Sequence, residues 1–259
     1  MNPFILLSVF FGVFVGKAIE PVYVYFYGKP LFIHFYPIPK KLKPFELEIL
    51  NSNFHYYSNL SPRKKKYFDH RVATFIQNYQ FIPKEGIEIS TEMKILIAAT
   101  AIKLSFGMRN YLVKVFDKII IYPESYYSTV NDVWHKGEFN PRMKAIVFSW
   151  EDFLAGYEYD NDNLNLGLHE FAHAYHLHGL KSSDVSALIF AETYKQIISY
   201  TAKPEIRTKL IASNYFRIYA YTNSFEFIAV LLEHFFETPE QFEIEFPELF
   251  QKVRKMINF

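Results

Sequence analysis

The residues of this chain best suited to do chemistry are two histidines and the glutamate between them. His169, Glu170 and His173 stand in the segment HEFAH. On an α-helix, positions i and i+4 share one face, so both imidazoles can bind one zinc ion while the glutamate reaches a metal-bound water. This spacing predicts the centre of a zinc peptidase site. The alternative is that both histidines are buried core residues. That alternative accounts well for a single histidine but poorly for two at this spacing with a glutamate between them.

A helix of about 16 residues is expected to carry this motif. The Asp and Asn residues at positions 160–163 are good N-cap residues, and Gly179 is expected to end the helix. Leu168 and Phe171 lie at positions that supply apolar contacts around the histidines.

A zinc site of this type needs a third protein ligand and an open position. In one large class that ligand is a histidine ten residues after the first, reached through a glycine at the seventh position. Here those two positions hold Gly179 and His176, so the chain is not of that class. The other solution is a carboxylate from a later helix. Glu226 is the best candidate, because a carboxylate in the apolar segment at 224–236 is costly to bury unless a cation neutralises it.

Two further polar residues lie at helical spacings from Glu226. Glu233 follows it by seven residues on the same helix face, where it could reach a histidine's second nitrogen or a backbone group. A solvated position at the rim of the site is the alternative for Glu233. Tyr219 precedes Glu226 by seven residues and could present its phenol to a substrate oxyanion.

These segments together resemble the Mlc titration factor A family, bacterial zinc peptidases whose catalytic core is similar to that of anthrax lethal factor. The resemblance covers residues 45–259, and its main segments are IVFSW at 146–150, LHEFAH at 168–173 and YAYTNSFEFIAVLLEHFF at 219–236. It implies an α+β fold, mainly helical and zincin-like, with a small mixed sheet beside the HExxH helix.

The resemblance also implies a role for each matching residue, and one Zn²⁺ per chain. It assigns the zinc ligands to His169, His173 and Glu226, the general base to Glu170 and the active-site tyrosine to Tyr219. One position departs from the family: His176 stands where an aspartate is usual, three residues after the second histidine. This change would alter zinc affinity or its response to pH.

Two classes of function follow. The first is a zinc-dependent peptidase, with aminopeptidase activity as one form, in which an activated water attacks a peptide or protein substrate and Glu170 is the base. The second is a binding protein that uses the same scaffold to sequester a transcriptional regulator, since the family's namesake binds the repressor Mlc and relieves repression of glucose-uptake genes. The intact Glu170 and Tyr219 favour chemistry. The absence of cysteine excludes a thiol nucleophile.

Composition agrees with one folded enzyme domain. The 259 residues are 50% hydrophobic and can bury a substantial core. Aromatic residues reach 19%, but the net charge is only +1 and no nucleic-acid motif accompanies them, so no nucleic-acid partner is expected. The basic run at 63–66 follows a helix start and is predicted to be a solvated first turn.

Periodicity predicts a series of helices and two strands. The helices are expected at about 61–80, 91–106, 183–200, 204–213, 224–237 and 247–257, and the strands at 119–122 and 145–150. The strand at 145–150 is either an ordinary core strand or one that lines the cleft and pairs with an extended substrate.

The first 44 residues are divided into an apolar segment at 1–16 and a linker at 17–44. Residues 3–16 carry no charge and are short for a membrane span, so a membrane anchor, a buried helix and a cleaved signal all fit. Basic residues follow this segment, and as an anchor it would leave the catalytic domain in the cytoplasm. A soluble cytoplasmic protein is the alternative. Residues Val22 to Tyr36 are expected to form a hairpin.

Overall fold

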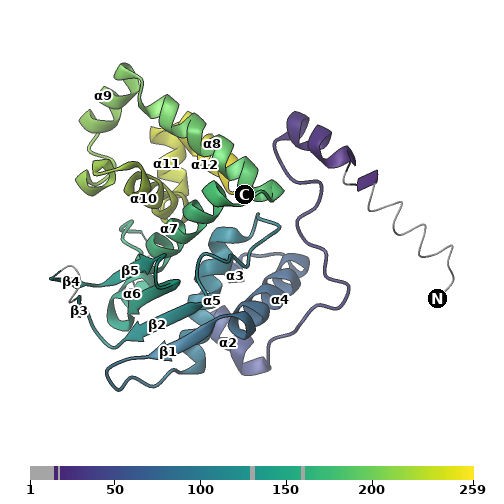
Figure 1. Cartoon of the computed structure of the whole chain (residues 1–259), viewed down its shortest axis with the longest axis vertical. Helices are drawn as coiled ribbons and strands as arrows, with labels where there is room; N and C mark the ends of the chain where they lie inside the picture. Colours follow the sequence, from purple (N-terminus) through teal and green to yellow (C-terminus); the bar gives the residue numbers. More distant parts are fainter. Residues whose placement is uncertain (1–14, 17, 129–131, 159–160) are drawn as a thin grey trace.

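The computed structural model describes residues 15–16, 18–128, 132–158 and 161–259. Helices make up most of the described chain and pack against a small mixed sheet (Figure 1). The strands of the larger sheet, in spatial order, are β1 (Gln80–Pro83), β2 (Lys118–Tyr122), β6 (Ala145–Ser149) and β5 (Gly137–Asn140). The first three are parallel and β5 runs antiparallel to β6, while β3 (Tyr126–Ser128) and β4 (Val133–His135) form a separate antiparallel pair. The expected α+β class is confirmed.

Most of the helices lie before β1 or after β6 in the sequence, and one lies between β1 and β2. They are α2 (Pro44–Asn53), α3 (His55–Ser58), α4 (Pro62–Asn78), α5 (Thr91–Ser105), α6 (Trp150–Glu158), α7 (Leu166–Lys181), α8 (Val185–Thr201), α9 (Pro204–Ala212), the 3₁₀ helix η1 (Ile218–Tyr221), α10 (Ser224–Glu237), α11 (Pro239–Glu245) and α12 (Pro247–Met256). Every expected helix is present, with ends that differ by a few residues. The short helices α2, α3, α6 and α11 and the 3₁₀ helix η1 were not expected.

The core is built around α5, which contacts α2, α4 and α7. It begins at Ser90, whose side chain accepts a hydrogen bond from the Met93 amide at 3.1 Å. Residues 95–102 of α5 are apolar apart from Thr100 and are all buried, as in a helix surrounded on every side. α5 therefore supports the inner face of α7, the helix that carries the HEFAH segment.

The strand β6 is a core strand. All five of its residues are buried, and it is hydrogen-bonded to β2 on one side and β5 on the other. With both edges occupied it cannot pair with a substrate, so the cleft-strand alternative for 145–150 is wrong. β5 is one of the two edge strands of this sheet and lies against α7, where a Cβ atom at Gly137 would come within 2.7 Å of Leu166 Cδ1.

Two expectations about the ends of α7 are wrong. Its N-cap is Asn165, whose side chain accepts a hydrogen bond from the Leu168 amide at 2.9 Å, and not a residue in 160–163. Gly179 does not end the helix, which continues to Lys181. A Cβ atom at Gly179 would lie 2.4 Å from the Phe190 ring, so this glycine allows α7 and α8 to pack closely.

The N-terminal segment does not form the expected hairpin. Residues 18–27 are helical, and residues 28–43 contain no strand. Gly28, with φ +61°, ends the helix in a conformation that favours glycine. The expected anchor at residues 3–16 lies almost wholly outside the described residues. Among the helices that the structure describes, none has the length and apolar character needed to cross a membrane.

Candidate metal centre

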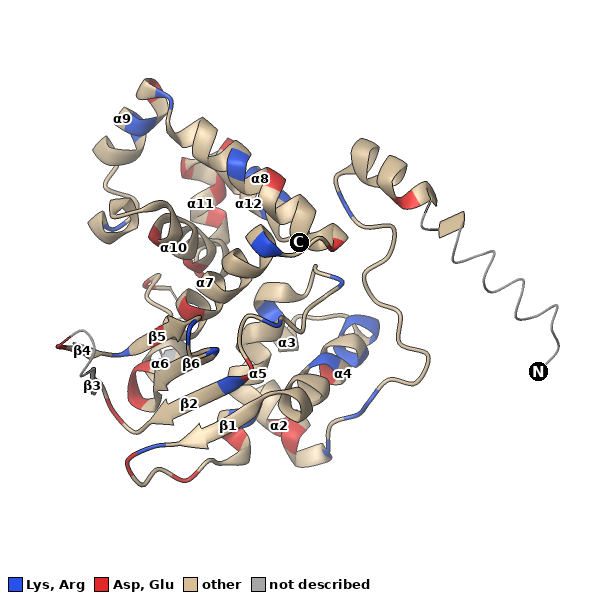
Figure 2. Ribbon diagram, in the orientation of Figure 1, with Lys and Arg blue, Asp and Glu red and all other residues tan. Residues whose placement is uncertain are grey.

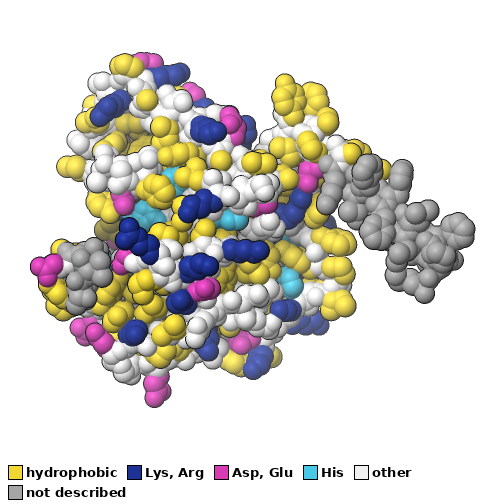
Figure 3. Space-filling model, viewed as in Figure 1, with side chains coloured by type: hydrophobic (Ala, Val, Ile, Leu, Met, Phe, Trp, Pro, Cys, Tyr) yellow, Lys and Arg dark blue, Asp and Glu magenta, His cyan; other side chains and the backbone are white. Residues whose placement is uncertain are grey.

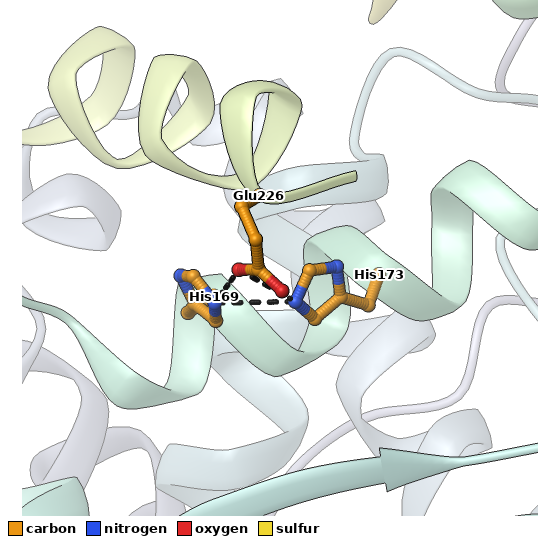
Figure 4. Close-up of side chains that lie close together, drawn as sticks. All are labelled: His169, His173 and Glu226. Atoms are coloured by element: carbon orange, nitrogen blue, oxygen red, sulfur yellow. Dashed lines mark hydrogen bonds and ion pairs between the residues drawn. The ribbon is translucent and has the colours of Figure 1, made fainter. Parts of the chain in front are cut away.

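Two helices bring together three side chains that could bind a metal ion (Figure 4). His169 Nε2 lies 3.1 Å from His173 Nε2 and 3.0 Å from Glu226 Oε2, and His173 Nε2 lies 3.4 Å from the same oxygen. Four ligands in a tetrahedron around zinc, at bonds of about 2.0–2.1 Å, are roughly 3.3–3.4 Å apart. The distances between the three donor atoms therefore agree, to within a few tenths of an ångström, with those required to bind one zinc ion.

Local structure at the start of α10 fixes the position of the carboxylate. The Asn223 side chain caps the helix by accepting hydrogen bonds from the amides of Phe225 at 2.8 Å and Glu226 at 3.0 Å. Residues 227–235 of α10 are all buried, and all but Glu233 and His234 are apolar; this helix packs against α7. Hydrophobic packing of these two helices thus places Glu226 opposite the histidines.

The electrostatics of this cluster favour a positive charge at its centre. Burial alone would lower the pKa of His169, but hydrogen bonds to Glu226 and Glu233 raise it to about 10. Burial alone would raise the pKa of Glu226, but hydrogen bonds from the two histidines hold it well below its usual range. A proton or a metal cation can supply this charge. Two imidazoles and one carboxylate are a donor set that suits zinc, which would displace the proton.

Glu170 lies beside the cluster and is fixed by the edge strand. Its Oε2 accepts a hydrogen bond from the Phe139 amide of β5 at 2.7 Å. Burial raises the pKa of Glu170, while the nearby His169 and His173 oppose this rise. A buried carboxylate that has capacity for a further proton is the chemistry expected of a general base.

Tyr219 reaches the same site from η1. Its ring centroid is 6.0 Å from that of His169, and half of its surface is exposed. Burial, followed by the neighbouring Glu226 carboxylate, raises the pKa of Tyr219 to about 12. The phenol is therefore protonated at neutral pH and can donate a hydrogen bond to a substrate.

Glu233 is fully buried, so the rim position considered for it is wrong. Its Oε1 lies 2.5 Å from His169 Nδ1, and Arg217 donates hydrogen bonds to both of its oxygens at 2.6 and 2.8 Å. The same arginine donates to the Asn163 carbonyl at 2.5 Å. Arg217 was not identified from the sequence. The sequence held one indirect signal for it: Glu233 lies in an apolar helix, and a carboxylate that is buried there needs a cationic partner.

His176 is not part of the donor cluster. It is fully buried, its ring is stacked on Phe225 at 4.1 Å, and Tyr194 lies 4.4 Å away. Neither ring nitrogen has a hydrogen-bond partner among the residues described, and burial lowers the pKa of His176 to about 4. This histidine is a neutral aromatic residue packed behind the helix turn that carries Glu226.

A pocket of about 470 Å³ opens beside His169. Arg217, Tyr219 and Leu166 line it, together with Asp152, whose Oδ1 is 2.7 Å from Lys136 Nζ. The pocket has room for a large side chain next to the candidate metal position.

The sequence of this chain matches a metallopeptidase family, and the His-His-Glu cluster could hold the metal ion that such a family implies. Residues 36–257 match the family described as glucose-regulated metallo-peptidase M90, and the chain belongs to it.

Three proteins are similar in sequence to this chain over most of its length. An uncharacterized protein, slr2042, of Synechocystis sp. (strain ATCC 27184 / PCC 6803 / Kazusa) is 26% identical over 83% of this chain and 84% of its own length. Mlc titration factor A of Klebsiella pneumoniae (strain 342) is 25% identical, over 75% and 79%. The protein of that name from Escherichia coli O127:H6 (strain E2348/69 / EPEC) is 26% identical, over 69% and 72%. The resemblance inferred from the sequence is confirmed.

Proposed function

We propose that this protein is a zinc-dependent peptidase in which His169, His173 and Glu226 hold one zinc ion. The observation that carries the proposal is the convergence of three donor atoms, 3.0 to 3.4 Å apart, next to a buried glutamate. Membership of a metallopeptidase family supports it.

Each nearby side chain has a distinct task in this proposal. A bound zinc ion supplies Lewis-acid activation of a water molecule and of the scissile carbonyl. Glu170 accepts the proton of the attacking water and passes it to the leaving amine, and its burial strengthens it as a base. Tyr219 donates a hydrogen bond to the oxyanion that develops on the substrate.

Glu233 and Arg217 orient the first histidine. The Glu233 carboxylate accepts the Nδ1–H of His169, which leaves the lone pair of Nε2 directed into the cluster. Arg217 holds the carboxylate through both of its oxygens. A pair fixed in this way keeps the imidazole in the tautomer that binds metal.

The edge strand β5 is the element proposed to bind the substrate backbone. Its inner edge pairs with β6, and the Phe139 amide points away from β6 towards Glu170. An extended peptide added along the outer edge would lie beside the cluster. The pocket next to His169 would then receive a substrate side chain.

The test begins with the metal content of the purified, chelator-free protein, measured by elemental mass spectrometry. About one zinc per chain is expected, because the ligand set is complete. Glu170→Gln should retain that zinc and lose at least about a hundredfold in the rate of hydrolysis of a peptide library. Glu243→Gln, at an exposed position on α11, is the matched control. An undiminished rate for Glu170→Gln would refute its role as the base.

The same library tests the aminopeptidase form of the proposal. Each peptide is offered with a free and with an acetylated amino terminus. An aminopeptidase cleaves only the free form, and it releases single residues in order from that end. Equal cleavage of both forms rejects aminopeptidase activity.

A regulatory role is a second candidate, because two of the relatives carry the name Mlc titration factor A. In this proposal the chain binds a transcriptional regulator of the Mlc type through the same scaffold. Glu170→Gln should keep that binding, since glutamine has the same size and shape as glutamate and should preserve the fold. Calorimetric titration with purified Mlc measures it, and the absence of binding by the parent protein rejects this regulator as a partner.

A further inference from the structure

The N-terminal part of the chain carries a large share of the exposed apolar surface. Of the 23 large apolar side chains exposed among the described residues, ten lie within residues 19–45. Tyr25 is 84% exposed, Phe26 and Phe35 73% each, and Ile38 90%. Figure 3 shows this apolar surface along the side of the molecule where the N-terminal segment lies. A patch of this kind marks an interaction site.

The same part of the chain is strongly basic. Residues 17–66 contain nine Lys and Arg against three Glu, whereas residues 67–259 contain 19 against 24 acidic residues. The run Arg63–Lys66 forms the exposed, basic first turn of α4, which points towards the N-terminal segment in Figure 2. His34 of that segment stacks on Tyr67, at 4.7 Å, directly after this turn. We refer to residues 18–45 and the first turn of α4 as the N-terminal face.

The N-terminal face is attached to the body of the protein by two arginines. Arg109 pairs with Glu20, and its guanidinium lies 3.9 Å above the Phe32 ring. Arg71 donates a hydrogen bond to the Tyr36 hydroxyl at 2.6 Å. The exposed rings therefore project from a base that is joined to the catalytic domain.

We propose that the N-terminal face docks on an anionic bilayer surface. Tyrosine and phenylalanine rings are suited to the boundary between headgroups and acyl chains, and lysines are suited to the phosphates above it. The uncharged, apolar residues 3–16 are continuous in sequence with this face. The N-terminal segment and the β3–β4 pair lie on opposite sides of the view in Figure 1, and no residue of the N-terminal face lines the pocket beside His169.

The experiment is vesicle co-sedimentation of the full chain. Vesicles of phosphatidylcholine with one quarter phosphatidylglycerol are compared with vesicles of phosphatidylcholine alone, at low and high salt. Binding should require the anionic lipid and weaken in high salt, because lysine–phosphate attraction is screened.

Two variants and two matched controls locate the contact. Tyr25→Ser/Phe26→Ser/Phe35→Ser and Lys29→Glu/Lys41→Glu should each lower partitioning at least about tenfold. The control variants carry equal changes at exposed positions elsewhere and should bind like the parent: Leu188→Ser/Ile211→Ser/Ile244→Ser and Lys195→Glu/Arg207→Glu.

Three results would overturn the proposal. One is the absence of binding to either vesicle. Another is parental binding by both variants of the N-terminal face, which would assign the membrane contact to residues outside it. The last is a concentration-dependent dimer that the aromatic variant abolishes, which would mean that a second copy covers this face. None of these results depends on peptidase activity.

Discussion

Arg71 in the N-terminal half and Glu233 in the C-terminal half are both fully buried charges, but different groups satisfy them. Among the residues that the structure describes, no carboxylate contacts Arg71. It donates to the carbonyls of Ser105, Phe106 and Met108 at 2.8 to 3.1 Å and lies 4.3 Å from the Tyr111 ring centroid. Glu233 is paired with Arg217 and with His169.

This difference separates stability from chemistry. Ser105 is the last residue of α5, and the carbonyls at the end of a helix lack intrahelical partners. Arg71 satisfies several of them at once and so fixes backbone geometry. Glu233 instead contacts a ring that can bind a proton or a metal. Loss of Arg71 should therefore lower the free energy of unfolding, and loss of the Glu233 contacts should lower metal affinity.

The largest expected effect is on stability. Arg71→Leu should lower the free energy of unfolding by about 3–5 kcal/mol, because it leaves buried carbonyls and the Tyr36 hydroxyl without a donor. Urea unfolding measures the change. Arg63→Leu, an exposed arginine on the same helix, should change it by less than about 0.5 kcal/mol. A small effect of Arg71→Leu would mean that water replaces the guanidinium.

The next largest effect concerns metal affinity. Glu226→Gln replaces a charged ligand by a neutral amide and should weaken zinc binding by at least about a hundredfold. Competition with a fluorescent chelator measures the affinity. The exposed Glu243→Gln substitution should leave it unchanged. If Glu226→Gln binds zinc as tightly as the parent, the third ligand is a different residue.

The parts of the site that the sequence predicted are those fixed by local spacing. His169 and His173 share a helix face by the i, i+4 rule, and Glu226 stands in a capped first turn. The role of Arg217 was not predicted, because it depends on how η1 packs against α10. No short-range sequence pattern encodes that packing. The same reason explains the error at Gly179, where contact with Phe190 outweighs the usual tendency of glycine to end a helix.

The fold was predicted where apolar periodicity was strong and failed where it was short. The helices at 61–80 and 224–237 have capping residues and long apolar faces, so their positions were found within two residues. Residues 22–36 alternate in polarity like a strand, but Val22–Tyr27 are helical and the segment beyond is held by Arg71 and Arg109. Tertiary contacts of this kind override local pattern.

The C-terminal half should also respond to acid through His234. This residue is buried against the rings of Phe216 and Tyr215, and burial lowers its pKa to about 4. Of the two smaller effects on this pKa, the Glu233 charge raises it and the Arg217 charge lowers it. The unfolded chain binds a proton near pH 6.5, so this contribution to stability is complete above that pH and is lost as the pH falls towards 4.

His234→Gln should therefore flatten the dependence of unfolding free energy on pH between 6.5 and 4, by about 2–3 kcal/mol over that range. Urea unfolding at a series of pH values measures it. The exposed His55→Gln substitution should leave the slope as it is in the parent. An unchanged slope in His234→Gln would show that this histidine can be protonated within the folded protein at little cost.

The smallest effect, and the sharpest test of the comparison, concerns Arg217. Arg217→Met and Glu233→Gln should each weaken zinc binding by about 10- to 100-fold, because either change releases the orientation of His169. If the two residues act as one unit, the double variant should bind zinc almost as tightly as the single variant with the lower affinity. The two substitutions would then be strongly non-additive in the free energy of zinc binding. Effects that multiply would instead mean that Arg217 acts on the metal position independently of Glu233.

Arg71→Leu provides the reference, since its folded form should bind zinc as the parent does. The charge on Arg71 fixes backbone carbonyls, whereas the charge on Arg217 acts on His169, the proposed metal ligand, through the Glu233 carboxylate.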